Sequence, residues 1–192
     1  MDLPMSASPL TVPAGPSGRP MAQPMEEGLL QAFQGHITSE RQASAAYFAM
    51  AIWCAERDLR GFCQFYRQEA AEEQMHAGKF ADYLIARGQA VVLEGLAAPR
   101  QDWATPAEIV AASFEMEADV SSSLQHLHRL AELAGDLRTS TFLEPIIEAQ
   151  LASEHNLAHL LARLRLAGQD AAALLILDSQ LADGTHTPPQ LA

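Results

Sequence analysis

Four long segments with a helical repeat of apolar residues each carry a glutamate, and this pattern constrains the fold more than any other feature. The glutamates are Glu40, Glu73, Glu117 and Glu148, and His76 follows the second of them by one helical turn. A carboxylate buried in a helical bundle costs several kcal/mol, even after relaxation, unless a positive charge compensates it. The sequence offers no matching lysines or arginines, so it predicts a pair of bound divalent metals.

The helical repeat also defines the expected elements, because apolar residues recur at steps of three and four. We expect helices over residues 26–57, 60–87, 105–133, 139–166 and 171–181. The run Thr105-Pro106, followed by Glu108, is typical of a helix start. Short links make the helices of each pair antiparallel, whereas the long link between the pairs permits a crossover along the bundle. The sequence therefore predicts an all-α four-helix bundle with one long crossover connection and a short fifth helix.

A change of composition separates this helical region from the ends of the chain. Residues 1–25 contain six prolines among serine, glycine and alanine. Such a stretch can neither continue a helix nor bury much apolar surface, so we expect a flexible tail. We expect one metal-binding domain over residues 26–182 and a second, C-terminal tail over residues 183–192.

Charge and cysteine content exclude several classes of function. A formal net charge of −12 with a single lysine argues against nucleic acid, whose phosphates need basic patches. An acidic surface suits attraction of cations, and solubility is an equal explanation. We see no signal peptide and no apolar run of the ~18 residues that span a bilayer, so we expect no membrane partner. Two cysteines outside any metal-binding spacing suit a reducing cytoplasm.

The pair Glu73 and His76 is the sharpest metal-binding signal, because residues three apart project from one helix face. Alone the spacing is weak, since most such pairs are solvated. Both residues, however, lie on the apolar stripe of their helix, as Glu40 and Glu117 do on theirs. Bundles that bind two irons place inward glutamates and an E-x-x-H motif in this manner. Oxygen ligands with one imidazole suit iron or manganese, and two ferrous ions would neutralise four carboxylates.

Longer motifs surround these candidate ligands. They are S-E-R-Q-A-S-A-A-Y in the first helix, A-E-E-Q-M-H in the second, M-E-A-D in the third and I-E-A-Q in the fourth. In this order and spacing they resemble the helix motifs of ferritins, over residues 26–181. The strings I-W-C-A-E-R and A-P-R-Q-x-W, with the short final helix, make the chain most similar to cyanobacterial ferritins.

The resemblance implies an iron-storage protein with ferroxidase activity. Two Fe(II) ions bind between the helices of each subunit, dioxygen or hydrogen peroxide oxidises them, and the ferric product collects inside a cage of 24 subunits. The implied di-iron ligands are Glu40, Glu73, His76 and Glu117. Tyr47 matches the tyrosine beside the centre, which can donate an electron. A tyrosine that only hydrogen-bonds to a ligand is an equal alternative.

The fourth helix resembles ferritins less closely. Gln150 occupies the position of the glutamine near the second iron, but Ser153 stands where many prokaryotic ferritins carry a glutamate. Glu148 and Glu144 are the carboxylates nearby, and either could reach inward. We expect Glu148 to be an iron ligand, and the alternative is a solvated or cavity-lining charge.

Two glutamates ahead of Glu73 are candidates for an accessory iron site. Glu69 and Glu72 fall where similar ferritins have a third iron position or a path for iron to the inner cavity, and Glu144 is a further candidate. A salt bridge between Glu69 and Arg67 or another neighbour is the alternative.

Two other classes of function remain open. A bacterioferritin-like protein, or another di-iron oxidase or peroxidase, would usually repeat E-x-x-H in the fourth helix. In this chain neither His155 nor His159 has a glutamate three residues before it. A non-catalytic helical scaffold would use the bundle for assembly alone, and it would not oxidise iron.

Overall fold

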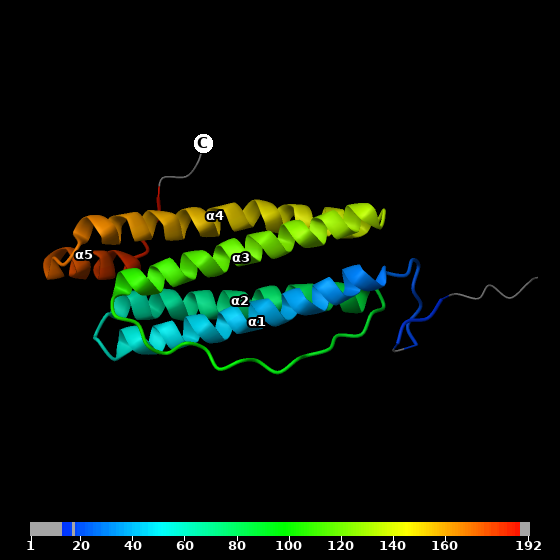
Figure 1. The fold of residues 1–192 in the computed structure, drawn as a ribbon, viewed down its shortest axis with the longest axis horizontal. Helices are drawn as coiled ribbons and strands as arrows, with labels where there is room; N and C mark the ends of the chain where they lie inside the picture. The colour runs from blue at the N-terminus through cyan, green and yellow to red at the C-terminus, as the bar shows by residue number, and fades with distance from the viewer. Residues whose placement is uncertain (1–12, 17, 189–192) are drawn as a thin grey trace, which may run out of the picture.

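The computed structural model describes residues 13–16 and 18–188, and these residues form five helices (Figure 1). The helices are α1 (Glu27–Ala55), α2 (Arg60–Ala86), α3 (Pro106–Leu133), α4 (Leu137–Ala167) and α5 (Ala171–Ala182). All five predicted helices are confirmed, with small differences at their ends. The predicted tails lie partly outside the described residues. None of these five helices has the length and apolar character that a membrane crossing needs.

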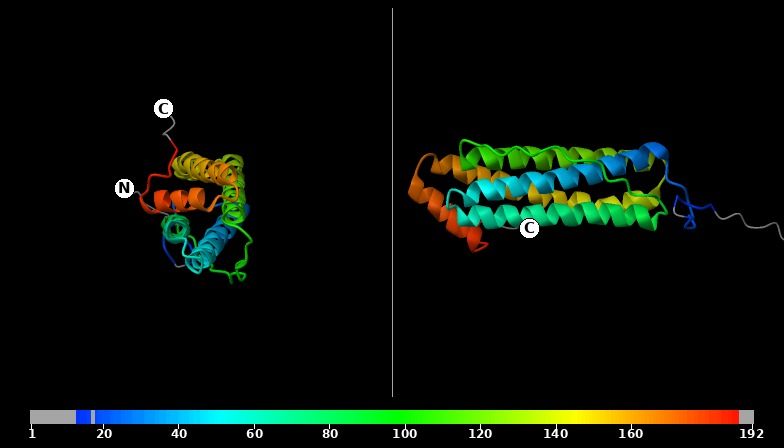
Figure 2. Two further views of the ribbon diagram at one scale, coloured as in Figure 1. Left: turned by 90° about the vertical axis from the view of Figure 1, so that its left-hand side faces the viewer. Right: turned by 90° about the horizontal axis from the view of Figure 1, so that it is seen from below.

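The order of the helices in space confirms the predicted crossover. Helices α1 and α2 run antiparallel, as do α3 and α4, whereas α2 and α3 run in the same direction (Figure 1). The segment between α2 and α3 extends along the outside of the bundle, from one end to the other (Figure 2). Helix α5 lies at the end where α4 terminates and α2 begins.

Glutamine side chains of α1 hold the crossover segment through its backbone. The Gln34 amide donates to the Ala90 carbonyl at 2.7 Å and accepts from the Val92 N–H at 3.0 Å. Gln42 makes the same pair of bonds with Ala97, both at 3.0 Å. An extended segment outside a sheet has no neighbouring strand to satisfy its N–H and C=O groups. The two glutamines supply those partners and fix the segment against α1.

The start of α3 confirms the cap that the sequence predicts. The Thr105 hydroxyl accepts a hydrogen bond from the Glu108 N–H at 3.1 Å, and Pro106 is the first helical residue. The Glu108 carboxylate accepts from the Ala104 N–H at 2.7 Å, one residue before the position that a capping box uses.

Helix α5 supplies a partner for the start of α2. Leu59, at the N-cap of α2, has no side-chain acceptor, and the Asp178 carboxylate of α5 accepts from the Phe62 N–H at 2.9 Å. This N–H is one of those that a helix cannot satisfy internally. The contact is close, because a Cβ at Gly61 would lie 1.7 Å from the Asp178 carbonyl oxygen. Glycine at this position therefore allows α5 to dock.

The core consists of two apolar clusters with a polar layer between them. One cluster contains Phe33, Phe80 and Leu124, and the other contains Trp53 and Phe62. In three helices a buried glutamate falls between members of the two clusters: Glu40 between Ile37 and Tyr47, Glu73 between Ala70 and Ala77, and Glu117 between Val110 and Val120. The apolar clusters on either side thus place these carboxylates in one layer of the bundle.

Candidate metal centre

Three side chains from α1 and α2 converge in the polar layer. Ligand atoms of Glu40, Glu73 and His76 all lie within 4.8 Å of one another. Glu40 is 2% exposed and Glu73 is 4% exposed, so both carboxylates are buried, whereas His76 is exposed. His76 Nδ1 lies 3.3 Å from Glu73 Oε2. Two carboxylates and an imidazole at this spacing form a donor set that suits a divalent transition metal.

Glu117 joins the same layer from α3, where two hydrogen bonds hold its carboxylate. The Tyr47 hydroxyl of α1 donates to Glu117 Oε1, and the Gln150 amide of α4 donates to Glu117 Oε2 at 2.7 Å. Glu117 is 3% exposed, and Tyr47 is fully buried. Glu117 is not one of the three residues whose ligand atoms converge within 4.8 Å. It therefore lies beside that group, held in place by a tyrosine and a glutamine.

A histidine outside the predicted site contacts Glu40. His36, one turn earlier on α1, is 1% exposed, and its Nε2 atom lies 2.9 Å from Glu40 Oε1. Its Nδ1 atom lies 2.8 Å from the Ser123 hydroxyl of α3. The four-residue spacing to Glu40 was a signal in the sequence, because it puts both side chains on one helix face. A single histidine without a motif did not suffice to identify it.

Burial makes ionisation of these carboxyl groups unfavourable. It raises the pKa of Glu40 and Glu117, and burial close to Glu40 raises the pKa of Glu73 to about 7. The Glu73 carboxylate raises the pKa of His76, whereas burial lowers the pKa of His36 to about 4. A bound cation favours the ionised carboxylates. A bound cation would therefore relieve the unfavourable electrostatics of the layer.

The protein itself supplies little positive charge to this layer. In the described part of the chain, the buried glutamates pair with His36 and His76 and with no lysine or arginine. Arg87, the buried arginine of that part, binds Asp136 at 2.8 Å near the turn between α3 and α4. Uncompensated buried carboxylates would strongly destabilise a bundle, which supports the sequence argument for bound metal.

The family of this chain is clear from its similarity to known proteins. A family model described as a ferritin-like domain matches residues 30–167. The chain belongs to the ferritin family. A bacterial non-heme ferritin of Staphylococcus epidermidis is 30% identical over 158 residues, which cover 82% of this chain and 95% of the relative. One of Staphylococcus aureus is 29% identical over 163 residues, covering 85% and 97%. As a member of this family, the protein is an iron-storage ferritin.

Solved ferritin structures share the fold of this ferritin. An open pore ferritin from the hyperthermophilic archaeon Archaeoglobus fulgidus aligns with a TM-score of 0.81 at 30% identity, covering 83% of this chain and 98% of that chain. A closed form of the same ferritin, engineered by site-directed mutagenesis, aligns with a TM-score of 0.80 at 30% identity, covering 88% and 100%. The closer likeness to cyanobacterial ferritins stays a prediction.

The accessory candidates on α2 differ in their surroundings. Glu69 is half-buried, and burial beside Glu72, Glu117 and Glu73 raises its pKa to about 8. Glu72 is exposed. Glu69 therefore interacts electrostatically with the buried carboxylates, whereas Glu72 faces solvent. An accessory iron position at these residues stays a prediction.

The candidate iron ligands on α4 lie in two different places. The Gln150 amide donates a hydrogen bond to Glu117. Glu148 and Glu144 are exposed, and they line a surface hollow between α3 and α4 with His128 and Glu132 of α3. Helix α4 continues through Pro145 from Leu137 to Ala167. Glu148 as an iron ligand stays a prediction, and no contact with the buried carboxylates supports it.

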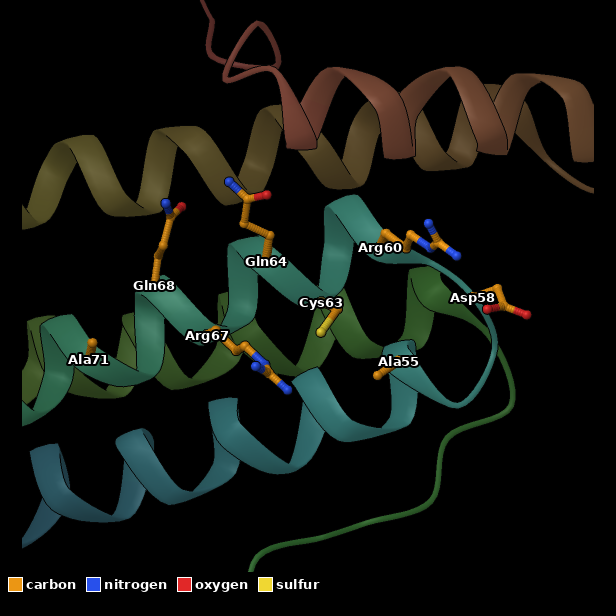
Figure 3. A pocket seen from close by; sticks show the side chains of 8 residues that line it. All are labelled: Ala55, Asp58, Arg60, Cys63, Gln64, Arg67, Gln68 and Ala71. Carbon is orange, nitrogen blue, oxygen red and sulfur yellow. The ribbon is translucent and has the colours of Figure 1, made fainter.

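Another surface hollow lies elsewhere on this ferritin, between α1 and α2 near their connecting turn (Figure 3). Its charged residues are Asp58, Arg60 and Arg67, and the Cys63 thiol points toward α1. Two arginines beside one carboxylate do not suit a cation. The hollow is thus separate from the buried layer, and none of the predicted iron ligands lines it.

Proposed function

We propose that this ferritin is a ferroxidase that binds two Fe(II) ions per subunit in the polar layer and oxidises them for storage. The observation that carries the proposal is the convergence of Glu40, Glu73 and His76, with Glu117 beside them, in a layer where the described residues place no arginine or lysine against the glutamates. Each buried carboxylate is then stabilised by its substrate cation. Iron storage follows from membership of the family, and the chemistry at this site is the part proposed.

The four residues provide ligands for two iron positions. Glu40 and His76 bind the first Fe(II), Glu73 bridges the two ions, and Glu117 binds the second. The convergence of the first three residues supports the first position. Hydrogen bonds from Tyr47 and Gln150 fix the direction of Glu117, which supports a preformed ligand for the second.

The oxidation needs no group beyond iron, oxidant and protons. Each of two Fe(II) ions gives up one electron. Dioxygen takes both electrons with two protons and becomes hydrogen peroxide; hydrogen peroxide as the oxidant takes two electrons and two protons and becomes two water molecules. Tyr47 keeps its proton, because burial and the nearby Glu117 hold its pKa well above the usual range. A phenol of this kind holds Glu117 and is also an available one-electron donor.

Assembly and location complete the proposal. We infer a cage of 24 subunits in the cytoplasm, with the ferric product inside. The Archaeoglobus structures are described as open pore and closed forms of a ferritin, which is consistent with an assembled shell. Large apolar side chains such as Phe48, Leu133 and Leu166 are exposed on the single chain, and apolar surface of this kind suits subunit contacts.

Stopped-flow absorbance with two Fe(II) per subunit in air tests the proposal. We expect rapid ferric absorbance from the wild type, with a break near two irons per subunit in a titration. Glu73→Gln preserves the side-chain shape but removes the bridging charge, so it should slow the reaction by about 100-fold, the scale seen when a catalytic electrostatic group is removed. Glu115→Gln, on the exposed surface of α3, is the matched control and should oxidise iron at the wild-type rate.

The same experiment separates this function from the alternatives. Equal rates in Glu73→Gln and wild type would favour a helical scaffold, since iron would then oxidise without the site. Gel filtration addresses storage independently, because a monomer or dimer would be too small to enclose a mineral. Neither result depends on which oxidant the protein prefers.

A further inference from the structure

His36 is a polar side chain of the buried layer that the proposed iron chemistry does not use. Its ring packs edge-to-face against Phe80, with centroids 4.3 Å apart at 64°. Its Nδ1 atom meets the Ser123 hydroxyl at 2.8 Å, and its Nε2 atom lies 2.9 Å from Glu40 Oε1. A side chain that is 1% exposed and bounded by α1, α2 and α3 has little freedom to turn. Its contact with Glu40 is therefore built into the packing.

Two atoms of this contact have no hydrogen-bond partner among the described residues. Nε2 of His36 and Oε2 of Glu40 are both buried and unpaired. The separation of 2.9 Å between Nε2 and Oε1 is short enough for a hydrogen bond, but the two atoms do not form one in the described structure. Unpaired buried polar atoms are rare, and each raises the free energy of the folded chain. A pair of them at one carboxylate points to a ligand that binds there.

One arrangement of the protons on His36 and Ser123 suits a cation bound to Glu40. A neutral imidazole has one N–H donor and one acceptor nitrogen, and a serine hydroxyl can do either. If the Ser123 hydroxyl donates to Nδ1, the proton of His36 is on Nε2 and faces Glu40. A cation that binds Glu40 would then contact Oε2, the oxygen that has no partner. A small rotation of the carboxylate would align Oε1 with the His36 N–H. Both unpaired atoms are satisfied in one step.

We propose that His36, held by Ser123, is a positioning residue that orients Glu40 for the first iron. The proposal rests on the proposed iron site and adds that the affinity of its first position depends on a residue that does not itself bind metal. His36 is not one of the three residues whose ligand atoms converge within 4.8 Å. Hydrogen bonds to ligating side chains commonly set metal affinity in proteins, and their loss weakens binding by about 10- to 100-fold.

Anaerobic titration with Co(II), which does not oxidise under these conditions, tests the proposal by its visible absorption. His36→Leu should weaken binding at the first position by about 10- to 100-fold. His36→Gln retains an N–H donor of similar reach and should recover most of the affinity. Ser123→Ala should fall between wild type and His36→Leu. His126→Gln, at an exposed position of α3, is the matched control and should bind Co(II) like the wild type.

Proton NMR of the Co(II) protein distinguishes positioning from ligation. One strongly shifted imidazole N–H resonance, from His76, is expected; a second one that disappears in His36→Leu would show that His36 binds the metal, and would overturn the proposal. Unchanged affinity in folded His36→Leu would overturn it as well. Should that variant not fold, wild-type affinity in Ser123→Ala would overturn the proposal in its place. A wild type that binds no Co(II) would instead contradict the iron site itself.

Discussion

The Tyr47 hydroxyl of α1 donates a hydrogen bond to the Glu117 carboxylate of α3, between two helices that are far apart in the sequence. Both side chains are buried, and the Gln150 amide holds the other carboxylate oxygen. A buried carboxylate with two donors has a defined direction before any metal binds. The hydrogen bond links the tyrosine of the ferritin-like motif to the proposed second iron position.

Tyr47→Phe tests that relationship by removing one oxygen atom. We expect the variant to lose about 1–3 kcal/mol of stability, because a hydrogen bond to a charged group is lost and the Glu117 oxygen has no replacement partner. Iron oxidation should slow by several-fold, while binding at the first position stays unchanged. Urea unfolding and stopped-flow absorbance measure the two effects. An unchanged rate with reduced stability would leave Tyr47 a structural role only.

Helix α4 allows a direct comparison of two predicted ligands. Gln150→Ala removes the amide that holds Glu117, so it should weaken the second metal position by about 10-fold. Glu148 is exposed and lies in a surface hollow between α3 and α4, so Glu148→Gln should change the Co(II) affinity little. Anaerobic Co(II) titration of both variants measures this. The opposite ranking would support Glu148 as the iron ligand that the sequence predicts.

Stability of the metal-free protein should fall as pH rises. Glu73 and Glu69 have folded-state pKa values of about 7 and about 8, above the ordinary value of 4.5 for both. The folded state therefore holds its protons more tightly than the unfolded state, and the stabilisation is complete below about pH 4.5 and lost as pH rises through 7 to 8. Urea unfolding between about pH 5.5 and 8 should show a loss of a few kcal/mol.

Metal should reverse this trend, because it binds the deprotonated carboxylates. With saturating Co(II), stability should rise over the same pH range. Glu73→Gln supplies the control, since a group that cannot ionise removes its share of the slope. A metal-free slope that is equal in Glu73→Gln and wild type would show that other groups dominate the dependence.

Gly61→Ala tests the docking of α5. The new Cβ would lie 1.7 Å from the Asp178 carbonyl oxygen, so α5 must move away and the hydrogen bond to the Phe62 N–H is lost. We expect a loss of several kcal/mol in thermal or urea unfolding, typical of overpacking against backbone. Gly78→Ala on the same helix is the matched control. Nothing lies within 4 Å of its new Cβ, and alanine should stabilise the helix by up to about 1 kcal/mol.

The sequence by itself determined the helices, their order and the burial of three glutamates. Apolar spacing sets which face of a helix turns inward, and that is a local property. Glu40, Glu73 and Glu117 lie on those faces, so their burial followed from the pattern. The E-x-x-H spacing likewise placed Glu73 and His76 on one face without knowledge of any other helix.

Only the tertiary structure decided which side chains meet across helices. The partners of Glu117 come from α1 and α4, and the partner of His36 comes from α3. Glu148 and Gln150 are two residues apart, which is about 200° around a helix, so only one of them can face Glu117, and the packing of α4 makes it Gln150. These contacts depend on how each helix is rotated and on the distance between helices. Packing between side chains that are distant in the sequence determines that rotation and distance.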